Sequence, residues 1–152
     1  MKTDQFLKQH GIPFSTHEHL PAYTAQEVAA EEHISGNRVA KTVVVRAGEQ
    51  YALCVLPASF KLDLEKVAQA LGVREALLAD ETEMAKLFPD AEVGAESPLG
   101  VLYDLPTVVD ERLAGHDEII FQAETHRQAI HMKFDDYSRL TDPIVADIAV
   151  HL

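Results

Sequence analysis

The sequence predicts a single α/β domain with a mixed or mostly antiparallel sheet flanked by helices. The chain has 152 residues, a length that one compact domain with its own core accommodates. Hydrophobic residues make up 47 % and charged residues 25 % of it, as in soluble globular proteins. Helical and strand patterns are intermixed and separated by hairpin-length gaps, without strict strand–helix–strand alternation. We therefore expect residues 1–152 to form one domain.

The N-terminal part of the chain carries signals for a helix, a strand and a second helix. Thr3 can cap a short helix that ends at Gly11, and residues 14–19, "FSTHEH", alternate like a strand. In "TAQEVAAEEH", Thr24 and Glu27 have the spacing of a capping box, in which each side chain satisfies a free backbone donor. We expect a helix to start there.

A β-hairpin is predicted for residues 39–57. Two runs rich in valine, leucine and tyrosine are joined by a glycine turn at Gly48, and Lys41 lies inside the first run.

Two capped helices and a short strand are expected to follow. The first helix has Asp63 as its cap, an apolar stripe at helical spacing and Gly72 as its terminator. The segment "ALLA" then reads as a strand. The second helix starts at Asp80, with Glu83 in capping position, and ends before Pro89.

The C-terminal part is predicted to add three strands and a helix. The strands are expected within residues 100–110, 118–124 and 129–134, with turns between them. A last helix is expected to start near Asp142, because Pro143 suits the first position of a helix.

Charge and composition exclude several classes of function. The 13 Lys and Arg against 25 Asp and Glu give a net charge of −12, so the chain cannot offer the broad basic face that dominates nucleic-acid affinity. Any contact with nucleic acid must be local. No segment has the length or apolarity of a signal peptide or a membrane span, and we expect a cytoplasmic protein. The single cysteine, Cys54, lies among strand formers and is expected to be a buried, inert thiol.

Lys41 is the first residue that draws attention as a binding group. It shares strand parity with Val39, Val43 and Val45, so a core-facing strand would carry the lysine inward, at a cost unless the ammonium meets an anion. The alternative is an edge strand that packs the lysine stem and leaves the amine in water.

The stretch "GAESPLG", residues 94–100, is the second such feature. Its glycines allow close backbone approach and its proline stiffens the chain, so the loop can hold backbone N–H groups at a fixed angle. The same residue types also dominate ordinary turns, and composition alone leaves both interpretations open.

Other chemistry is weakly supported. The chain has 8 histidines, and His17 and His19 share a strand face, but no third ligand at metal-site spacing is apparent, and we expect no metal. Ser97 lacks the flanking pattern of a serine nucleophile. No phosphate-loop or dinucleotide fingerprint occurs. The remaining set is a lysine on a strand, a glycine–proline loop and a late polar cluster in "AETHRQAIHM", without a general base.

Taken in order, these elements resemble the YbaK and ProX group of aminoacyl-tRNA deacylases, the free-standing relatives of the editing domain of bacterial prolyl-tRNA synthetases. The lysine of "AKT" and the loop from Gly94 to Pro98 are the hallmarks of that family. The likeness covers most of the chain, in "TAQEVAAEEHISGNRVAKTVVV", "YALCVLPASFKLDLEKVAQALG", "LFPDAEVGAESPLGVLYDLPTVVDERL" and "HRQAIHMKFDDYSRL".

The resemblance implies a curved mixed sheet with a pocket between the lysine strand and the loop. It implies hydrolysis of the ester that joins a wrong amino acid to the terminal ribose of a tRNA, with no metal, cofactor or protein nucleophile. Lys41 would anchor the phosphate or ribose, Gly94 and Ala95 would orient the carbonyl and the water, and a ribose hydroxyl would assist the attack. The implied substrate-binding residues are Thr42, Ser97, Pro98, Gly100, Thr125, His126 and Arg127.

Two positions depart from the family pattern. Many relatives have glycine where this chain has Glu124, and a carboxylate near a phosphate site repels its ligand. Ser97 stands where close relatives often have a second proline. These departures motivate an alternative, a non-catalytic aminoacyl-tRNA or nucleotide-binding module with the same pocket. The acidic charge motivates another, an esterase of small aminoacyl compounds.

The implied partner is the acceptor end of an aminoacyl-tRNA. Contact would be limited to Lys41 and to Arg38 or Arg127, with a synthetase or an elongation factor holding the rest of the tRNA. Neither DNA nor a membrane is an expected partner. Because few phosphates would be neutralised, binding is expected to be weak and salt-sensitive.

Overall fold

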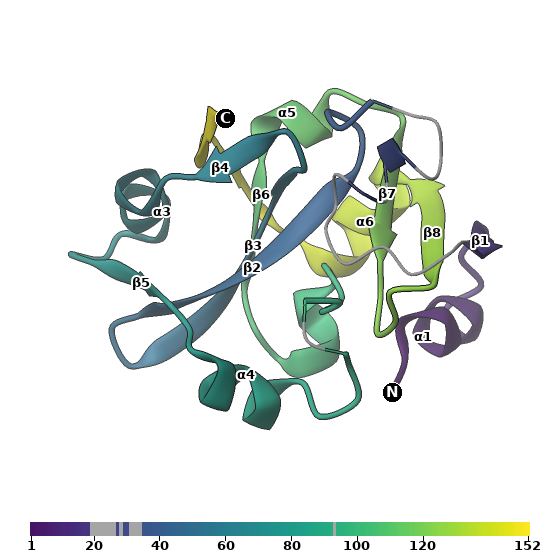
Figure 1. Ribbon diagram of the computed structural model, residues 1–152, viewed down its shortest axis with the longest axis horizontal. Coiled ribbons are helices and arrows are strands. Elements are labelled where there is room, and N and C mark those ends of the chain that lie inside the picture. Colours follow the sequence, from purple (N-terminus) through teal and green to yellow (C-terminus); the bar gives the residue numbers. More distant parts are fainter. Residues whose placement is uncertain (19–26, 28, 31–34, 93) are drawn as a thin grey trace.

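The centre of the molecule is a five-stranded mixed sheet, seen in a computed structural model that describes residues 1–18, 27, 29–30, 35–92 and 94–152 (Figure 1). The strands run in the order β5-β2-β3-β6-β9, with antiparallel pairing from β5 to β3 and parallel pairing from β3 to β9. Their bounds are β2 Ala40–Ala47, β3 Gln50–Pro57, β5 Ala76–Leu78, β6 Thr107–Asp110 and β9 Ile144–Ala146.

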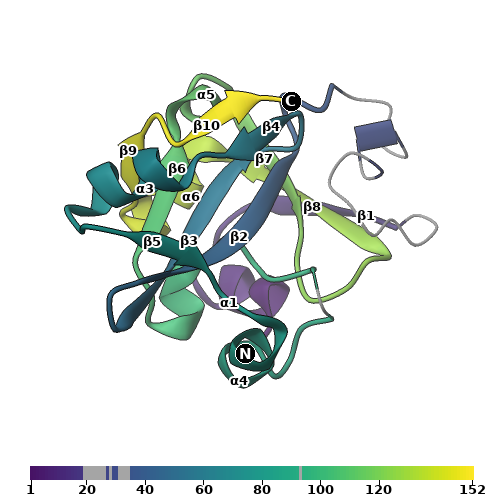
Figure 2. The same cartoon turned by 60° about the vertical axis from the view of Figure 1, so that its left-hand side comes forward.

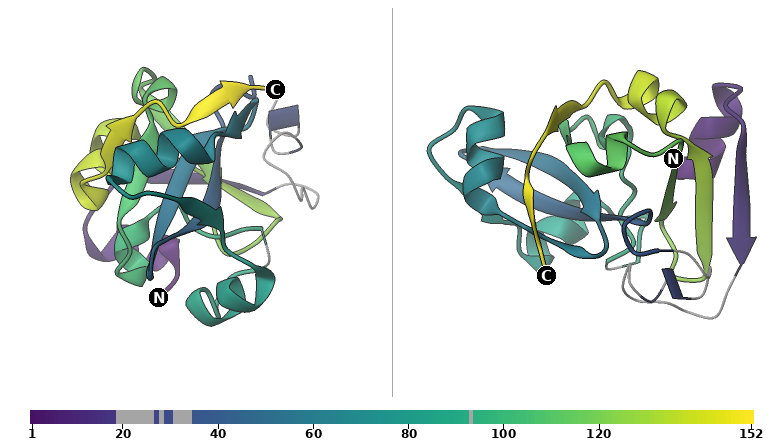
Figure 3. Two further views of the ribbon diagram at one scale, coloured as in Figure 1. Left: turned by 90° about the vertical axis from the view of Figure 1, so that its left-hand side faces the viewer. Right: turned by 90° about the horizontal axis from the view of Figure 1, so that it is seen from above.

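A second, three-stranded antiparallel sheet lies on the opposite side of the molecule from α3 and β5 (Figure 3). It consists of β1 (Phe14–Glu18), β8 (Gln128–Lys133) and β7 (Glu118–Gln122), in that order. A parallel bridge between Val39 and Ile120 joins its β7 to the start of β2. The chain end β10 (Ala149–His151) pairs with β4 (Phe60–Leu62) in a small separate sheet (Figure 2).

Helices cover both faces of the central sheet. On one face, α3 places Val67 and Ala68 against Cys54, while on the other α4 contributes to a cluster around Phe88. The main core lies between the central sheet, the three-stranded sheet and helices α1 and α6. The helices are α1 Thr3–Gln9, α3 Leu64–Leu71, α4 Glu81–Leu87, the 3-10 helix η1 Gly100–Tyr103, α5 Glu111–Ala114 and α6 Phe134–Thr141.

Most of the predicted elements are confirmed, and the single-domain mixed α/β class with them. The hairpin turns at Gly48 with φ +67°, where glycine is favoured. Asp63 caps α3 by accepting from Glu65 N and Lys66 N, and Gly72 ends it in the left-handed conformation. The helix expected from Thr24 falls almost entirely outside the described residues.

Two predictions for the C-terminal half of the chain were wrong, one of them in part. No helix starts at Asp142: this residue is the left-handed C-cap of α6, and the chain after Pro143 forms β9. Proline is common just after a helix end as well as at a helix start, so its presence did not decide between them. The strand expected over residues 100–110 is confined to Thr107–Asp110, because Gly100–Tyr103 forms η1.

The N-cap of α1 is Lys2, and Thr3 is the first helical residue. The Thr3 hydroxyl therefore does not have the capping role that the sequence suggested, and it is hydrogen-bonded to Ser97 and Glu124 instead. Within the described part of the chain, no helix is long and apolar enough to cross a membrane.

Candidate active site

The stretch "GAESPLG" is a loop that is exposed at Gly94 and buried from Ala95 onward. Every residue from Ala95 to Gly100 is buried, although the segment has no regular structure until η1 starts at Gly100. Ser97 and Leu99 have no exposed surface, and Glu96 is only 4 % exposed. Surface turns do not have this burial, because loops normally run over the outside of a protein.

Buried polar partners hold the second half of this loop. The Tyr137 hydroxyl donates to Pro98 O at 2.9 Å, and Gly100 N donates to Thr107 Oγ1 at 3.2 Å. A Cβ at Gly100 would overlap Thr107 Oγ1 and the carbonyl oxygen of Leu105. Pro98 and Gly100, both expected to bind substrate, therefore fix the shape of the loop.

The first half of the loop carries the backbone groups expected to orient a substrate carbonyl. Gly94 has φ +86°, a conformation that favours glycine, and its N–H donates to Glu96 Oε1 at 3.1 Å. Ala95 N donates to Glu92 O at 2.9 Å. Glu96 Oε2 is buried and has no hydrogen-bond partner among the described residues. The Gly94 N–H thus already points at a carboxylate oxygen, whereas the Ala95 N–H stabilises a turn.

The β7–β8 turn lies directly against this loop. Glu124 N donates to Ala95 O at 2.7 Å, and Glu92 N donates to Glu124 O at 2.9 Å. His126 N donates to Glu92 Oε2 at 3.2 Å, and the His126 side chain is 4 % exposed, with Nδ1 3.1 Å from Gln122 Oε1. Two segments about thirty residues apart in the sequence thereby form one unit.

Lys41 lies near the start of β2, where its side chain is half-buried. Its Nζ donates to Ala58 O at 3.3 Å, and burial lowers the pKa of the ammonium group. The adjacent Ala40 packs in the same core cluster as Leu99 and Ala123, so the lysine strand, the loop and the β7–β8 turn meet at one core. The half-buried side chain and its bond to Ala58 O are compatible with both orientations that the sequence left open.

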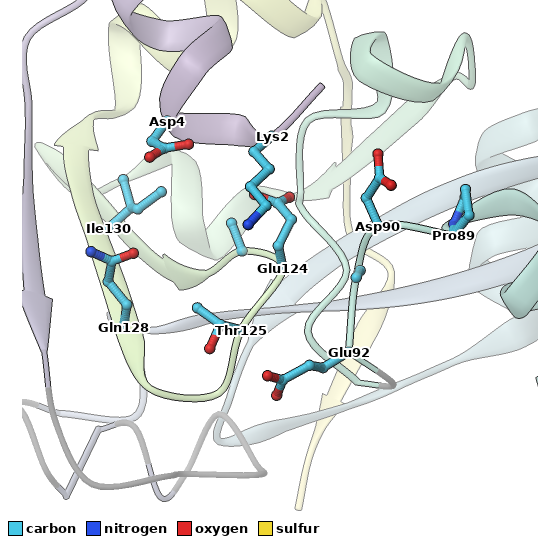
Figure 4. A pocket seen from close by; sticks show the side chains of 11 residues that line it. Lys2, Asp4, Pro89, Asp90, Glu92, Glu124, Thr125, Gln128 and Ile130 are labelled. Atoms are coloured by element: carbon cyan, nitrogen blue, oxygen red, sulfur yellow. The ribbon is translucent and has the colours of Figure 1, made fainter.

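A cavity of about 540 Å³ opens beside the loop and the β7–β8 turn (Figure 4). Four carboxylates line it against one ammonium group, so it disfavours a phosphate. Thr125 is the only residue of the expected site among those that line it. The lining residues are Lys2, Asp4, Pro89, Asp90, Ala91, Glu92, Ala123, Glu124, Thr125, Gln128 and Ile130.

Two other expected binding residues are Thr42 and Arg127. Thr42 is half-buried in β2 next to Lys41 and pairs with Val55 of β3. Arg127 is exposed in the β7–β8 turn, with its backbone N–H donating to Thr125 Oγ1 at 3.2 Å. Arg127 is therefore available to a ligand in solvent.

Residues that the sequence did not indicate as part of the site also hold the loop and the β7–β8 turn together. Glu92, Thr3 and Tyr137 each donate or accept a hydrogen bond that fixes the loop or its neighbouring turn. The sequence indicates Glu124 only as a position that departs from the family pattern, not as a residue that holds the loop. The contacts join distant segments, so no local pattern could have revealed them.

Among the described residues, the remaining reactive groups offer no alternative centre. Cys54 is fully buried, and this burial raises the pKa of its thiol to about 12. The imidazoles of His17 and His131 stack at 4.0 Å on the three-stranded sheet. Across the described ranges, no three His, Cys, Asp or Glu side chains are grouped to hold a metal ion.

The chain belongs to the aminoacyl-tRNA editing domain family, whose model matches residues 19–140. This match spans the lysine strand, the buried loop and the β7–β8 turn.

Individual relatives are similar over nearly the whole chain. A protein of Enterococcus faecalis with the proposed activity of a Cys-tRNA(Pro)/Cys-tRNA(Cys) deacylase, EbsC, is 25 % identical over 95 % of this chain and 90 % of its own. The crystal structure of a proposed trans-editing enzyme for prolyl-tRNA synthetase superposes with a TM-score of 0.82 at 26 % identity, covering 95 % of this chain and 92 % of that one. A scaffold protein used for epitope grafting gives a TM-score of 0.83 at 28 % identity, covering 96 % and 93 %.

Proposed function

We propose that this protein is a trans-editing deacylase that hydrolyses the ester of a mischarged aminoacyl-tRNA. The observation that carries the proposal is the loop Gly94–Gly100, buried from Ala95 onward, which meets the β7–β8 turn and the Lys41 strand within a chain of the editing family. In the reaction, water adds to the ester carbonyl carbon. The bond to the ribose oxygen then breaks, that oxygen takes one of the two protons of the water, and the amino acid leaves as a carboxylate while the other proton passes to the solvent.

Lys41 is the residue proposed to anchor the substrate. A half-buried ammonium whose pKa burial lowers has lost part of its hydration, so an anionic phosphate stabilises it more than it would an exposed lysine. Its present partner is a neutral carbonyl, that of Ala58. A phosphate or ribose oxygen of the acceptor end would take the remaining donor positions.

Gly94 N–H is the group proposed to stabilise the carbonyl oxygen as it becomes negative. In this structure the N–H binds a carboxylate oxygen of Glu96, which is the charge type that develops on an ester carbonyl during water attack. Substrate would replace Glu96 at this donor. We assign Ala95 to the shape of the loop, because its N–H is bound to Glu92 O.

No side chain with the position of a general base is needed if a ribose hydroxyl of the substrate assists the attacking water. Positioning then supplies most of the rate enhancement, which agrees with a loop fixed by buried hydrogen bonds. A synthetase or an elongation factor would hold the body of the tRNA, since the chain has a net charge of −12.

The test is hydrolysis of a panel of tRNAs mischarged with alanine, cysteine, serine and other small amino acids. Lys41→Ala is the inactive variant, and Lys61→Ala, which removes an exposed lysine of β4, is the matched control. We expect wild type and Lys61→Ala to release the amino acid from at least one tRNA, and Lys41→Ala to be slower by at least about a hundredfold.

Equal activity of Lys41→Ala and wild type would refute the assigned role of Lys41. Comparable turnover of free aminoacyl esters and of aminoacyl-tRNA would instead indicate an esterase of small compounds. Absence of hydrolysis on every tRNA would refute the deacylase assignment.

A further inference from the structure

Glu124 has a backbone conformation that its residue type disfavours. Its φ is +67°, in the left-handed region. The described part of the chain has two other non-glycine residues with positive φ, Asp104 and Asp142, and both are helix C-caps, where this conformation is common. Glu124 caps no helix. Such strain persists only where the surroundings hold the residue in place.

The side chain of Glu124 is buried against the start of α1, as Figure 4 shows. Oε1 accepts from Thr3 N at 2.8 Å and Oε2 accepts from Thr3 Oγ1 at 2.8 Å. The Thr3 and Ser97 hydroxyl oxygens are hydrogen-bonded at 2.7 Å. Glu124 is 8 % exposed and the other two residues are fully buried, so these bonds are largely shielded from water. We call these three residues the Glu124–Thr3–Ser97 network.

The backbone of Glu124 is attached to the same loop. Its N–H donates to Ala95 O at 2.7 Å, and its carbonyl accepts from Glu92 N at 2.9 Å. The loop is therefore held at Glu92 and Ala95 by the backbone of residue 124, and at Ser97 by its side chain through Thr3. These three attachments enclose Gly94, the residue whose N–H is proposed to meet the substrate carbonyl.

We propose that Glu124 is a positioning residue, which fixes the Glu92–Ser97 loop through the Glu124–Thr3–Ser97 network and thereby sets the position of the Gly94 N–H. The inference rests on the proposed deacylase function. Glu124 acts through other residues and does not touch the substrate. Its carboxylate, which the sequence led us to expect would repel a phosphate, accepts hydrogen bonds from Thr3 at the start of α1.

The hydrogen-bond chemistry predicts which substitutions preserve the loop. Glu124→Gln keeps an oxygen for Thr3 N–H, and its amide can donate to Thr3 Oγ1, whose own hydrogen then turns to Ser97 Oγ. Glu124→Gly relieves the backbone strain but removes both bonds to Thr3. Thr3→Val removes the hydroxyl at nearly constant shape and breaks the link to Ser97.

The first experiment measures amide hydrogen exchange of residues 92, 94–97 and 99, which needs no substrate. We expect exchange to be faster by about tenfold or more in Glu124→Gly and Thr3→Val, and unchanged in Glu124→Gln. Asp142→Gly is the matched control, because it relieves the same kind of backbone strain at an exposed residue outside the network. Unchanged exchange in Glu124→Gly and Thr3→Val would overturn the proposal.

The second experiment measures deacylation on the tRNA that wild type hydrolyses best, at a temperature where all variants are folded. We expect kcat to fall about tenfold or more in Glu124→Gly and Thr3→Val, with KM within about twofold, and the double variant to be no slower than the slower single one. Glu124→Gln should retain the wild-type kcat.

The two experiments separate the two proposals. If wild type hydrolyses no tRNA, the deacylase function fails while the exchange result still decides whether the network holds the loop. If wild type is active and the variants with a loosened loop are equally fast, the positioning role is refuted. Loss of activity in Glu124→Gln as large as in Glu124→Gly would also refute it, because a charge effect would then be responsible.

Discussion

Replacing Gly100 by alanine tests whether the buried loop leaves room for even one methyl group. Gly100 does not have the positive φ that would itself exclude alanine, so the backbone could accept the change. The surrounding atoms leave no room for the methyl group. The new Cβ would overlap Thr107 Oγ1 and Leu105 O and would lie 3.3 Å from Leu53 Cδ1. Two of these three neighbours are fixed polar atoms, and one of them accepts the hydrogen bond from Gly100 N at 3.2 Å.

The expected destabilisation combines two effects. Overpacking a well-packed core costs about 1–3 kcal/mol, and weakening a buried hydrogen bond adds about 1 kcal/mol. The movement that relieves the overlap is also the movement that lengthens the bond, so we expect about 2–4 kcal/mol in total. For a chain of this size that corresponds to a melting temperature lower by about 4–16 °C.

Gly115→Ala is the control, because it makes the same chemical change with the opposite expected sign. Gly115 has φ −81° and ψ −4°, and the nearest atom to a new Cβ would be Arg112 O at 3.7 Å. Alanine there reduces the entropy of the unfolded chain and should raise stability by about 0.4–1 kcal/mol. Thermal and urea unfolding of both variants measure the difference. If Gly100→Ala is no less stable than Gly115→Ala, the close packing of the loop against Thr107 is refuted.

Three further outcomes are expected. Hydrogen bonds from Lys66 and Arg112 lower the pKa of Asp147 to about 2 from an ordinary value of 3.8, so its contribution to stability is complete above that ordinary value and is lost as the pH falls towards 2. Thermal melts along an acid series should therefore show a smaller acid-induced loss for Asp147→Asn than for wild type, and parallel curves would contradict this. Cys54 should resist thiol reagents in the native protein at mild alkaline pH and react after denaturation, because burial raises the pKa of its thiol to about 12. Binding of aminoacyl-tRNA should fall with salt along a log–log slope of about −1 to −3, and a steeper slope would mean that more phosphates are contacted than Lys41 and its few basic neighbours can neutralise.

The elements that the sequence predicted correctly are those specified by neighbouring residues. Asp63 and Gly72 define α3 from its two ends, and Gly48 defines the β2–β3 turn, each by a conformational requirement that acts within a few residues. The segment after Asp142 has no local signal that distinguishes a helix from a strand. It forms the strand β9 because it pairs in parallel with β6, whose residues lie more than thirty positions earlier in the sequence.

The same distinction holds for the candidate site. The residue types of "GAESPLG" indicated a loop, and strand parity indicated an inward Lys41, but neither could reveal that the loop is buried. Burial depends on Thr3, Glu124 and Tyr137, which come from three other segments. From the sequence, the carboxylate of Glu124 is expected to repel a phosphate. Its actual partner, Thr3, is 121 positions away in the chain, so the sequence could not reveal that the carboxylate is already hydrogen-bonded.

The distribution of charge explains how an acidic chain can act on tRNA. The carboxylates of the cavity beside the loop, Asp4, Asp90, Glu92 and Glu124, would repel a phosphate there, and Lys2 offsets only one of them. Lys41 is absent from that cavity and lies at the start of β2, next to Ala40, which packs with Leu99 of the loop. The ammonium group proposed to anchor the acceptor end therefore lies outside the acidic cavity. Under the proposed function, the net charge of −12 disfavours contact with the rest of the tRNA, and we expect recognition to be confined to the end that carries the amino acid.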